Sequence, residues 1–117
     1  MFYSCLNLTN LILPSTITSI EDGAFYECIA LTSFVFPNKI TIINGAVFSD
    51  CSGLISVTLP DGLTKIDNYA FSNASSLSSI IYKGVTYTSK SAFLTAMQDN
   101  GIQVVRPVDF DSTALQP

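Results

Sequence analysis

The large apolar residues of this chain return at a fixed interval of 23 residues. The stretch from Ile20 to Pro37, IEDGAFYECIALTSFVFP, recurs in most of its pattern as INGAVFSDCSGLISVTLP between Ile43 and Pro60. The main apolar columns are Phe2, Phe25, Phe48 and Phe71; Cys5, Cys28, Cys51 and Ala74; Leu8, Leu31, Leu54 and Leu77; and Leu11, Phe34, Val57 and Ile80. A fixed period of about 20 to 29 residues is typical of stacked repeats, so we expect one short structural unit to be copied along the chain.

The centre of each unit predicts a short β-strand. It follows a Leu-x-x-Leu-x-Leu pattern and reads LTNLIL, LTSFVF, LISVTL and LSSIIY in successive copies. These segments are rich in apolar and β-branched residues, and in three of them Pro14, Pro37 or Pro60 follows and ends the strand, because proline lacks a ladder donor. We expect the strands to lie side by side and parallel, about 4.8 Å apart, with the apolar columns facing inward.

After the fourth of these strands the repeat pattern stops. Lys83 and Gly84 then predict a tight turn between two strands. A helix follows, capped by Ser89 or Ser91 and ended by Gly101, and a short final strand covers IQVV. A separate prediction concerns the apolar face of the helix, which should hold Ala92, Phe93, Ala96 and Met97.

These patterns divide the chain into three parts. Residues 1–82 hold the repeats, with units at 2–24, 25–47 and 48–70 and a partial unit at 71–82. Residues 83–106 are expected to form a strand-helix-strand cap, because a stack of repeats needs its open end covered, and 107–117 a flexible tail. At the other end, the strand from Leu8 to Leu13 is expected to be a bare edge, which could pair in a homodimer unless further repeats precede it.

The second half of each unit carries a further signature. An apolar pair such as Ile17 and Ile20 precedes a small residue and Phe, as in SIEDGAF and KIDNYAF. Together with the strand, Pro and Cys, this resembles the BspA-like leucine-rich repeat family, whose pattern is L-x-x-I-x-I-P-x-x-V-x-x-I-x-x-x-A-F-x-x-C. The resemblance covers residues 2–82, although Gly45–Val47 shift the Gly-Ala pair by one position and Ala74 replaces the last Cys.

Period and resemblance together imply an α/β-type repeat fold. We expect a mostly β, right-handed leucine-rich repeat solenoid with a parallel sheet and about four 23-residue coils. The resemblance also implies a secreted or cell-surface bacterial protein that takes part in adhesion or host interaction. The start, MFYSCLNLTN, lacks the regions of a signal peptide, so we expect any export signal to have been removed or to lie upstream.

Composition narrows the possible partners. Hydrophobic residues make up 48% of the chain and charged residues 12%, with a formal net charge of -4 and five scattered Lys and Arg. Such a chain offers no basic surface for phosphate backbones, so nucleic acid is not expected as a partner. No apolar run reaches the length of about 18 residues that a membrane span needs, so membrane insertion is not expected either.

The reactive side chains favour a structural interpretation over a catalytic one. Cys5, Cys28 and Cys51 lie one repeat apart, which predicts a row of small buried side chains; a bridge between two neighbours stays open, although the expected spacing is wider than a disulfide prefers. The chain has no His, so a Ser-His-Asp, Cys-His or ordinary zinc site cannot be built, and only a Ser-Lys pair remains formally possible. We expect neither an enzyme nor a cofactor.

Two acidic columns leave calcium open as a minor alternative. Glu27 aligns with Asp50, and Glu21 aligns with Asp67 with Asn44 between them. Carboxylate and amide oxygens can bind Ca²⁺, but Asp, Asn and Gly are also ordinary turn residues. Solvated turns are therefore the favoured interpretation.

The third and fifth positions of each strand pattern face outward on the expected concave sheet. They form one row of small polar residues and one that is mostly aliphatic: Asn10, Ser33, Ser56 and Ser79, then Ile12, Val35, Thr58 and Ile81. These side chains could simply pack along the sheet, as β-branched neighbours do, or form a strip that holds a protein or glycan ligand. The functional hypotheses are therefore a binding or adhesion module and, alternatively, a structural spacer or self-assembly unit of a longer surface protein.

Overall fold

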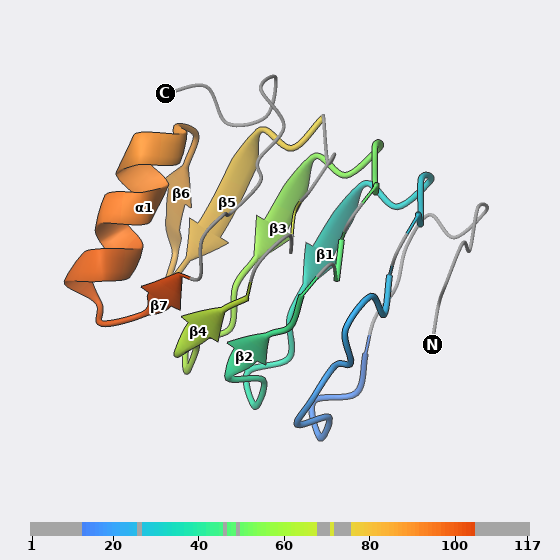
Figure 1. The fold of residues 1–117 in the computed structure, drawn as a ribbon, viewed down its shortest axis with the longest axis horizontal. Helices are drawn as coiled ribbons and strands as arrows, with labels where there is room; N and C mark the ends of the chain where they lie inside the picture. Colours follow the sequence, from blue (N-terminus) through green and yellow to red (C-terminus); the bar gives the residue numbers. More distant parts are fainter. Residues whose placement is uncertain are drawn as a thin grey trace.

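The computed structural model of the chain describes residues 13–25, 27–45, 47–48, 50–67, 71 and 76–104. In chain order the elements are β1 (Ser33–Val35), β2 (Ile42–Ile43), β3 (Ser56–Thr58), β4 (Lys65–Ile66), β5 (Ser79–Tyr82), β6 (Val85–Tyr87), α1 (Lys90–Asp99) and β7 (Gln103–Val104). The strands form two layers, sheet A with the order β1-β3-β5-β6 and sheet B with the order β2-β4-β7. Figure 1 shows the two sheets along the stack and α1 at the end that β6 and β7 occupy.

Sheet A is built from the strands that the Leu-x-x-Leu-x-Leu segments predict. β1, β3 and β5 pair in parallel, and the register places Ser33 opposite Ser56 and Ser56 opposite Ser79. The 23-residue period of the sequence is therefore the register of the sheet, and the predicted parallel arrangement is confirmed. β6 then closes this row as an antiparallel neighbour of β5.

The strands of sheet A are shorter than the segments that predict them, with three residues in β1 and β3 and four in β5. The bonding between repeats nevertheless continues beyond the strand ends. Ile55 N donates to Thr32 O over 2.7 Å before β3, and Phe36 N donates to Thr58 O over 3.0 Å after β1. Each repeat is thus bonded to the next along more of the chain than the strands themselves cover.

Sheet B is a feature that the strand pattern does not predict. Its strands β2, β4 and β7 contain two residues each and pair in parallel, with Ile43 opposite Ile66 and Ile66 opposite Val104. Ile43 and Ile66 are fully buried, because this row faces the interior. The predicted final strand is confirmed as β7, and it lies beside β4 as the last member of sheet B.

Side-chain hydrogen bonds repeat the 23-residue interval at the corners of the stack. Gly45 N donates to Asp22 Oδ1 over 3.2 Å, and Asp61 N donates to Asn38 Oδ1 over 3.3 Å. Thr64 Oγ1 donates to the carbonyl of the residue 23 positions earlier over 3.0 Å. Polar turn residues therefore bond to the equivalent turn of the preceding repeat.

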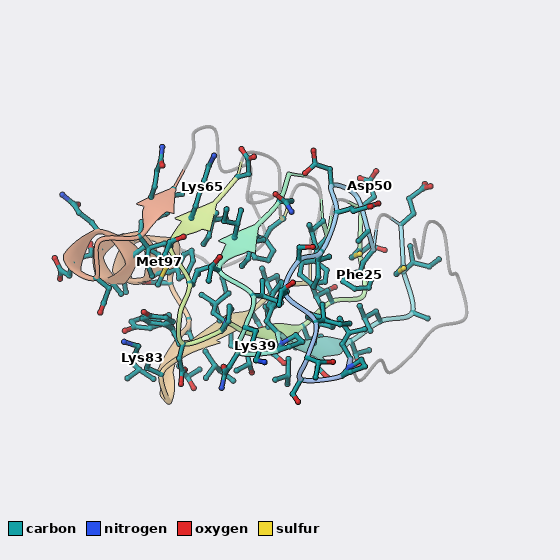
Figure 2. The ribbon with its side chains drawn as sticks, turned by 90° about the horizontal axis from the view of Figure 1, so that it is seen from below. Phe25, Lys39, Asp50, Lys65, Lys83 and Met97 are labelled. Atoms are coloured by element: carbon teal, nitrogen blue, oxygen red, sulfur yellow. The ribbon has the colours of Figure 1, made fainter. Side chains whose placement is uncertain are left out.

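A column of stacked phenylalanines fills the space between the sheets. The rings of Phe25 and Phe48 are 5.6 Å apart and those of Phe48 and Phe71 are 5.8 Å apart, with interplanar angles of 18° and 11°. Phe34 and Phe36 meet the Phe48 ring edge-on at 5.4 and 5.7 Å. Figure 2 shows Phe25 and Met97 in the interior, while the labelled lysines lie at the periphery.

The segment after the repeats forms the predicted turn, helix and strand. Lys83 and Gly84 have positive φ values of 49° and 79°, as a two-residue hairpin turn between β5 and β6 requires. Ser89 is the N-cap of α1, and its hydroxyl accepts from Ala92 N over 3.2 Å. Gly101, with φ 70°, ends the helix in a Schellman motif.

The bonds of this motif explain how the chain turns from α1 into β7. Ile102 N donates to Met97 O over 2.9 Å, and Gly101 N donates to Gln98 O over 3.1 Å. Phe93, Met97 and Ile102 are buried, so the helix end is fastened to the core. The prediction for the helix face was wrong at Ala92, which is exposed, because the face that packs against the core is centred on Phe93 and Met97 and is extended by Leu94 on the side away from Ala92.

Several predicted features lie outside the described residues. They are the columns at Phe2, Cys5, Leu11 and Ala74, the outward positions Asn10 and Ile12, the edge over Leu8 to Ile12, and the tail at 107–117.

Candidate functional site

The outward residues of β1, β3 and β5 form one surface, which we call the outer face of sheet A. Its described members are Ser33, Val35, Ser56, Thr58, Ser79 and Ile81. The pairing register brings them into two rows, one of three serines and one that runs from Val35 through Thr58 to Ile81. Neighbouring members of a row are about 4.8 Å apart, the spacing between strands in a sheet.

Exposure differs along the aliphatic row. Val35 is 64% exposed, whereas Thr58 and Ile81 are half-buried. β6 extends the row by one strand, because Thr86 lies opposite Ile81 and is itself exposed. The outer face of sheet A is therefore open at β1 and at β6, and less exposed at β3 and β5 between them.

The chemistry of this face suits contact rather than reaction. Its described residues offer hydroxyl groups, which donate and accept hydrogen bonds, and aliphatic side chains, which bury apolar area. The six residues include no carboxylate, amine or thiol that could act as a nucleophile or general base. A partner would be held by shape, apolar burial and neutral hydrogen bonds.

The structure also shows exposed apolar residues beyond those that the strand pattern singled out. Ile55 is 49% exposed just before β3, Ile29 is 45% exposed in the loop before β1, and Val85 is 50% exposed in β6. Ile42 is 42% exposed on β2 and so belongs to sheet B. Ile55 occupies the second, non-leucine position of the Leu-x-x-Leu-x-Leu pattern, and this is the signal in the sequence that could have indicated its exposure.

Cys28 and Cys51 are both completely buried, and no disulfide joins them to each other. Cys51 Sγ donates to Phe25 O over 2.9 Å, a contact between neighbouring repeats. Burial raises the pKa of the Cys51 thiol to about 12; a hydrogen bond from the backbone of Cys28 opposes this shift, while the charges of Cys28 and Asp50 add to it. A thiol this hard to ionise is a poor nucleophile and a poor metal ligand.

The acidic columns sit in turns with unusual backbone. Glu27 and Asp50 have φ values of 58° and 63°, the left-handed conformation that a turn uses. The amide nitrogen of Asn44 donates to the carbonyl of Ile20 in the preceding repeat. Within the described part of the chain, no group of three or more His, Cys, Asp and Glu is placed to hold a metal ion.

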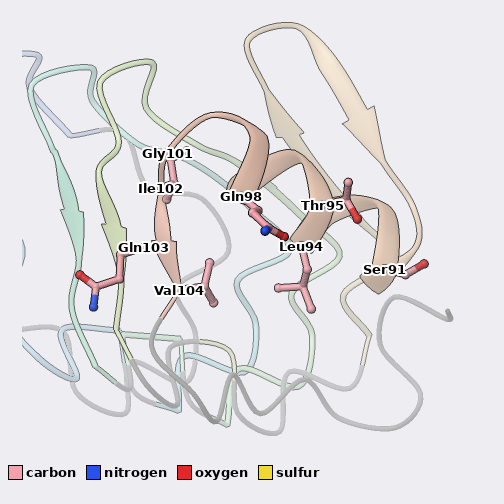
Figure 3. A pocket seen from close by; sticks show the side chains of 8 residues that line it. All are labelled: Ser91, Leu94, Thr95, Gln98, Gly101, Ile102, Gln103 and Val104. Carbon is pink, nitrogen blue, oxygen red and sulfur yellow. The ribbon is translucent and has the colours of Figure 1, made fainter.

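A shallow groove of about 550 Å³ lies between α1 and β7 (Figure 3). Leu94 and Val104 give it an apolar floor, and hydroxyl and amide groups such as those of Thr95, Gln98 and Gln103 surround it. None of its lining residues carries a charge or a thiol. The described lining of the groove therefore offers hydroxyl and amide groups for hydrogen bonding and an apolar surface for contact.

Parallel strands in a 23-residue register, an inward phenylalanine column and a corner cysteine together define a leucine-rich repeat protein. A model of the family described as BspA type leucine rich repeat region matches residues 1–106 in six copies. The chain belongs to this family.

Among solved structures, the chain is similar to a leucine rich cell surface protein of Faecalibacterium prausnitzii A2-165. The two share 33% sequence identity with a TM-score of 0.72, over 94% of this chain and 25% of that chain. The present chain therefore spans about a quarter of the length of that protein. Comparison with curated proteins found no match. Across the described residues there is no helix with the length and apolarity to cross a membrane.

Proposed function

We propose that this chain is a non-enzymatic binding module of a bacterial cell-surface protein, and that the outer face of sheet A contacts a protein or glycan partner. The observation that supports this most directly is the alignment of two uncharged outward rows across three parallel strands. We infer that this sheet is the concave side of a right-handed solenoid of about four coils, formed by the 23-residue repeats.

The comparisons support the location. The similar protein of F. prausnitzii is a leucine rich cell surface protein, and the family match identifies leucine-rich repeats in the present chain. We infer an extracellular or cell-surface position for the present chain, with its ligand reached from outside the cell. The repeat architecture favours this role, because stacked repeats present an extended surface without a deep pocket.

The test is a binding screen of the purified chain against glycan arrays and extracellular-matrix proteins. A Val35→Glu/Ile81→Glu variant places two carboxylates on the outer face of sheet A, about 10 Å apart across two strand spacings. An Ile42→Glu variant is the matched control, because Ile42 is a 42% exposed aliphatic residue on sheet B.

Binding that is lost in the double variant and kept in Ile42→Glu supports the proposal. Equal binding by all three proteins excludes this face as the contact surface. Circular dichroism and the unfolding temperature of each variant must first show that the fold is retained, because Ile81 is half-buried.

A structural spacer or self-assembly unit is the second candidate function. The observation that favours it is the spacing of the polar corner bonds, which repeats at 23 residues and would suit a stack that continues into further repeats. Self-association through the predicted edge from Leu8 to Leu13 should then appear in sedimentation velocity as a dimer whose share rises with concentration. A monomer at every concentration contradicts edge pairing.

A further inference from the structure

The chain contains two Asn-Gly pairs, Asn44–Gly45 and Asn100–Gly101, and both lie where the backbone turns. An asparagine side chain loses its amide most readily when glycine follows, because glycine has no Cβ atom to keep its backbone nitrogen away from that side chain. In a folded chain the reaction also depends on how often the two residues are released from their contacts. The two pairs differ in this respect.

The first pair is held by the preceding repeat. The side-chain amide of Asn44 donates to the carbonyl of Ile20, and Gly45 N donates to Asp22 Oδ1 over 3.2 Å. Gly23 N in turn donates to Gly45 O over 3.0 Å. The buried residues on either side of the pair are Ile43, Val47 and Phe48. The Gly45 nitrogen is therefore released only when two packed repeats separate at this corner.

The second pair is held by the end of a helix. Among the described residues, its bonds come from the last turn of α1: Asn100 Nδ2 donates to Ala96 O over 2.8 Å, and Gly101 N donates to Gln98 O over 3.1 Å. Both residues of the pair are exposed, and Figure 3 shows Gly101 at the turn between α1 and β7.

The conformation of Asn100 shows what must change before the pair can react. Its ψ is 10°, at which the Gly101 nitrogen does not face the Asn100 side chain, so the turn has to open first. Terminal turns open at a lower free energy than packed interior segments. Opening at Asn100 therefore occurs more often than opening at Asn44.

We propose that Asn100 is the site at which the folded chain is modified by loss of a side-chain amide, and that the bonds to the preceding repeat protect Asn44. The Gly101 nitrogen attacks the side-chain carbonyl carbon of Asn100 and forms a new C–N bond. The side-chain nitrogen leaves as ammonia, taking the proton that Gly101 loses, and a succinimide ring remains. One water molecule then opens the ring to aspartate, or to isoaspartate, in which the main chain passes through the side-chain carbon.

The modification removes a bond and adds a charge at the end of α1. A carboxylate has no proton to donate, so the bond from the Asn100 side chain to Ala96 O is lost. The new negative charge lies next to Asp99 at the C-terminal end of the helix, where the helix dipole disfavours it. The turn that joins α1 to β7 is therefore loosened. This inference is independent of the proposed binding function.

Peptide mapping by mass spectrometry of the full chain, kept at pH 8 either folded or unfolded in urea, tests the proposal. In the folded chain Asn100 should lose its amide at least about tenfold faster than Asn44, because its turn opens more often. In urea the two rates should agree within about threefold, because glycine follows both residues. Equal rates in the folded chain, or loss at Asn100 in urea alone, overturn the proposal.

A pair of variants tests the protection of Asn44. Asp22→Ala removes the acceptor of the Gly45 N–H bond and should raise the rate at Asn44 in the folded chain at least about threefold, with the rate at Asn100 unchanged. Glu21→Ala is the matched control, because it removes a neighbouring exposed carboxylate and keeps that bond. The same rate at Asn44 in both variants overturns the protective role of the preceding repeat.

Discussion

Gly53 marks a close approach between the backbones of two neighbouring repeats, and replacing it tests how tightly they are packed. A Cβ atom at this position would lie 2.3 Å from the carbonyl oxygen of Ile29, which is about 1 Å nearer than an ordinary contact. The oxygen belongs to backbone, and its neighbours are bonded: Ile29 N donates to Glu27 O over 2.9 Å, and Leu31 N donates to Cys28 O over 3.1 Å. The repeats would have to separate locally.

The sequence columns alone predict the opposite result. Ala30 and Ser76 occupy the positions equivalent to Gly53 in the neighbouring repeats, so an alanine there looks harmless. Overpacking that moves backbone costs about 1 to 3 kcal/mol. We expect Gly53→Ala to lower the free energy of unfolding by that amount, which for a domain of this size lowers the melting temperature by about 4 °C for each kcal/mol.

Gly62→Ala is the matched control for this experiment. A Cβ atom at Gly62 would be 3.8 Å from Asn38 O, an ordinary contact, and the change removes the extra freedom of glycine in the unfolded chain. We expect this variant to be as stable as the parent or more stable by up to about 1 kcal/mol. Urea unfolding of both variants checks the pair, and a Gly53→Ala chain as stable as Gly62→Ala would refute the close approach.

Three further predictions concern single side chains. Phe48→Leu should lower the free energy of unfolding by about 2 kcal/mol or more in denaturant titrations, because Phe48 contacts four other rings. The control Val35→Ala, at an exposed position, should change the free energy of unfolding by less than about 0.5 kcal/mol. Similar losses in the two variants would contradict the stacked core. Between pH 9 and 12 the raised pKa of Cys51 keeps the folded thiol protonated while the unfolded thiol loses its proton. The contribution of the protonated thiol to stability is therefore complete below pH 9, and the free energy of unfolding falls by about 1.4 kcal/mol per pH unit between pH 9 and 12. Unfolding measured at pH 8 and pH 10 should therefore show a smaller loss of stability in Cys51→Ala than in the parent, and equal losses would exclude this cause. Ser89→Ala should cost about 1 kcal/mol through the lost N-cap, and Ser91→Ala less than about 0.5 kcal/mol; thermal unfolding that ranks them the other way would place the cap at Ser91.

Most of the fold could be predicted from the 23-residue period of the sequence, because each column of similar residues repeats one structural environment. The parallel pairing of β1, β3 and β5 and the burial of Phe25, Phe48 and Phe71 follow from the columns. Sheet B was not predicted, since two-residue strands leave too short a pattern to recognise. Their pairing depends on the neighbouring repeats holding them in register.

The candidate site was less predictable than the fold. Val35 and Ile81 share a column, yet one is 64% exposed and the other half-buried, because β6 pairs with β5 and lies beside Ile81. The orientation of α1 shows the same limitation: Ala92 has a helical spacing that suits the core, but packing turns it outward. Both outcomes depend on which element becomes the neighbour, and a residue pattern within one segment does not contain that information.

The corner hydrogen bonds between residues 23 apart have a consequence for how such a chain can change length. An insertion or deletion of one residue shifts every later side chain out of its column and moves strand residues to the opposite face of the sheet. Adding or removing a whole unit, such as residues 25–47, leaves every column matched and each turn bonded to an equivalent turn. Genes for this kind of protein can therefore gain or lose length by unequal exchange between repeats, and designed arrays can be lengthened by the same step.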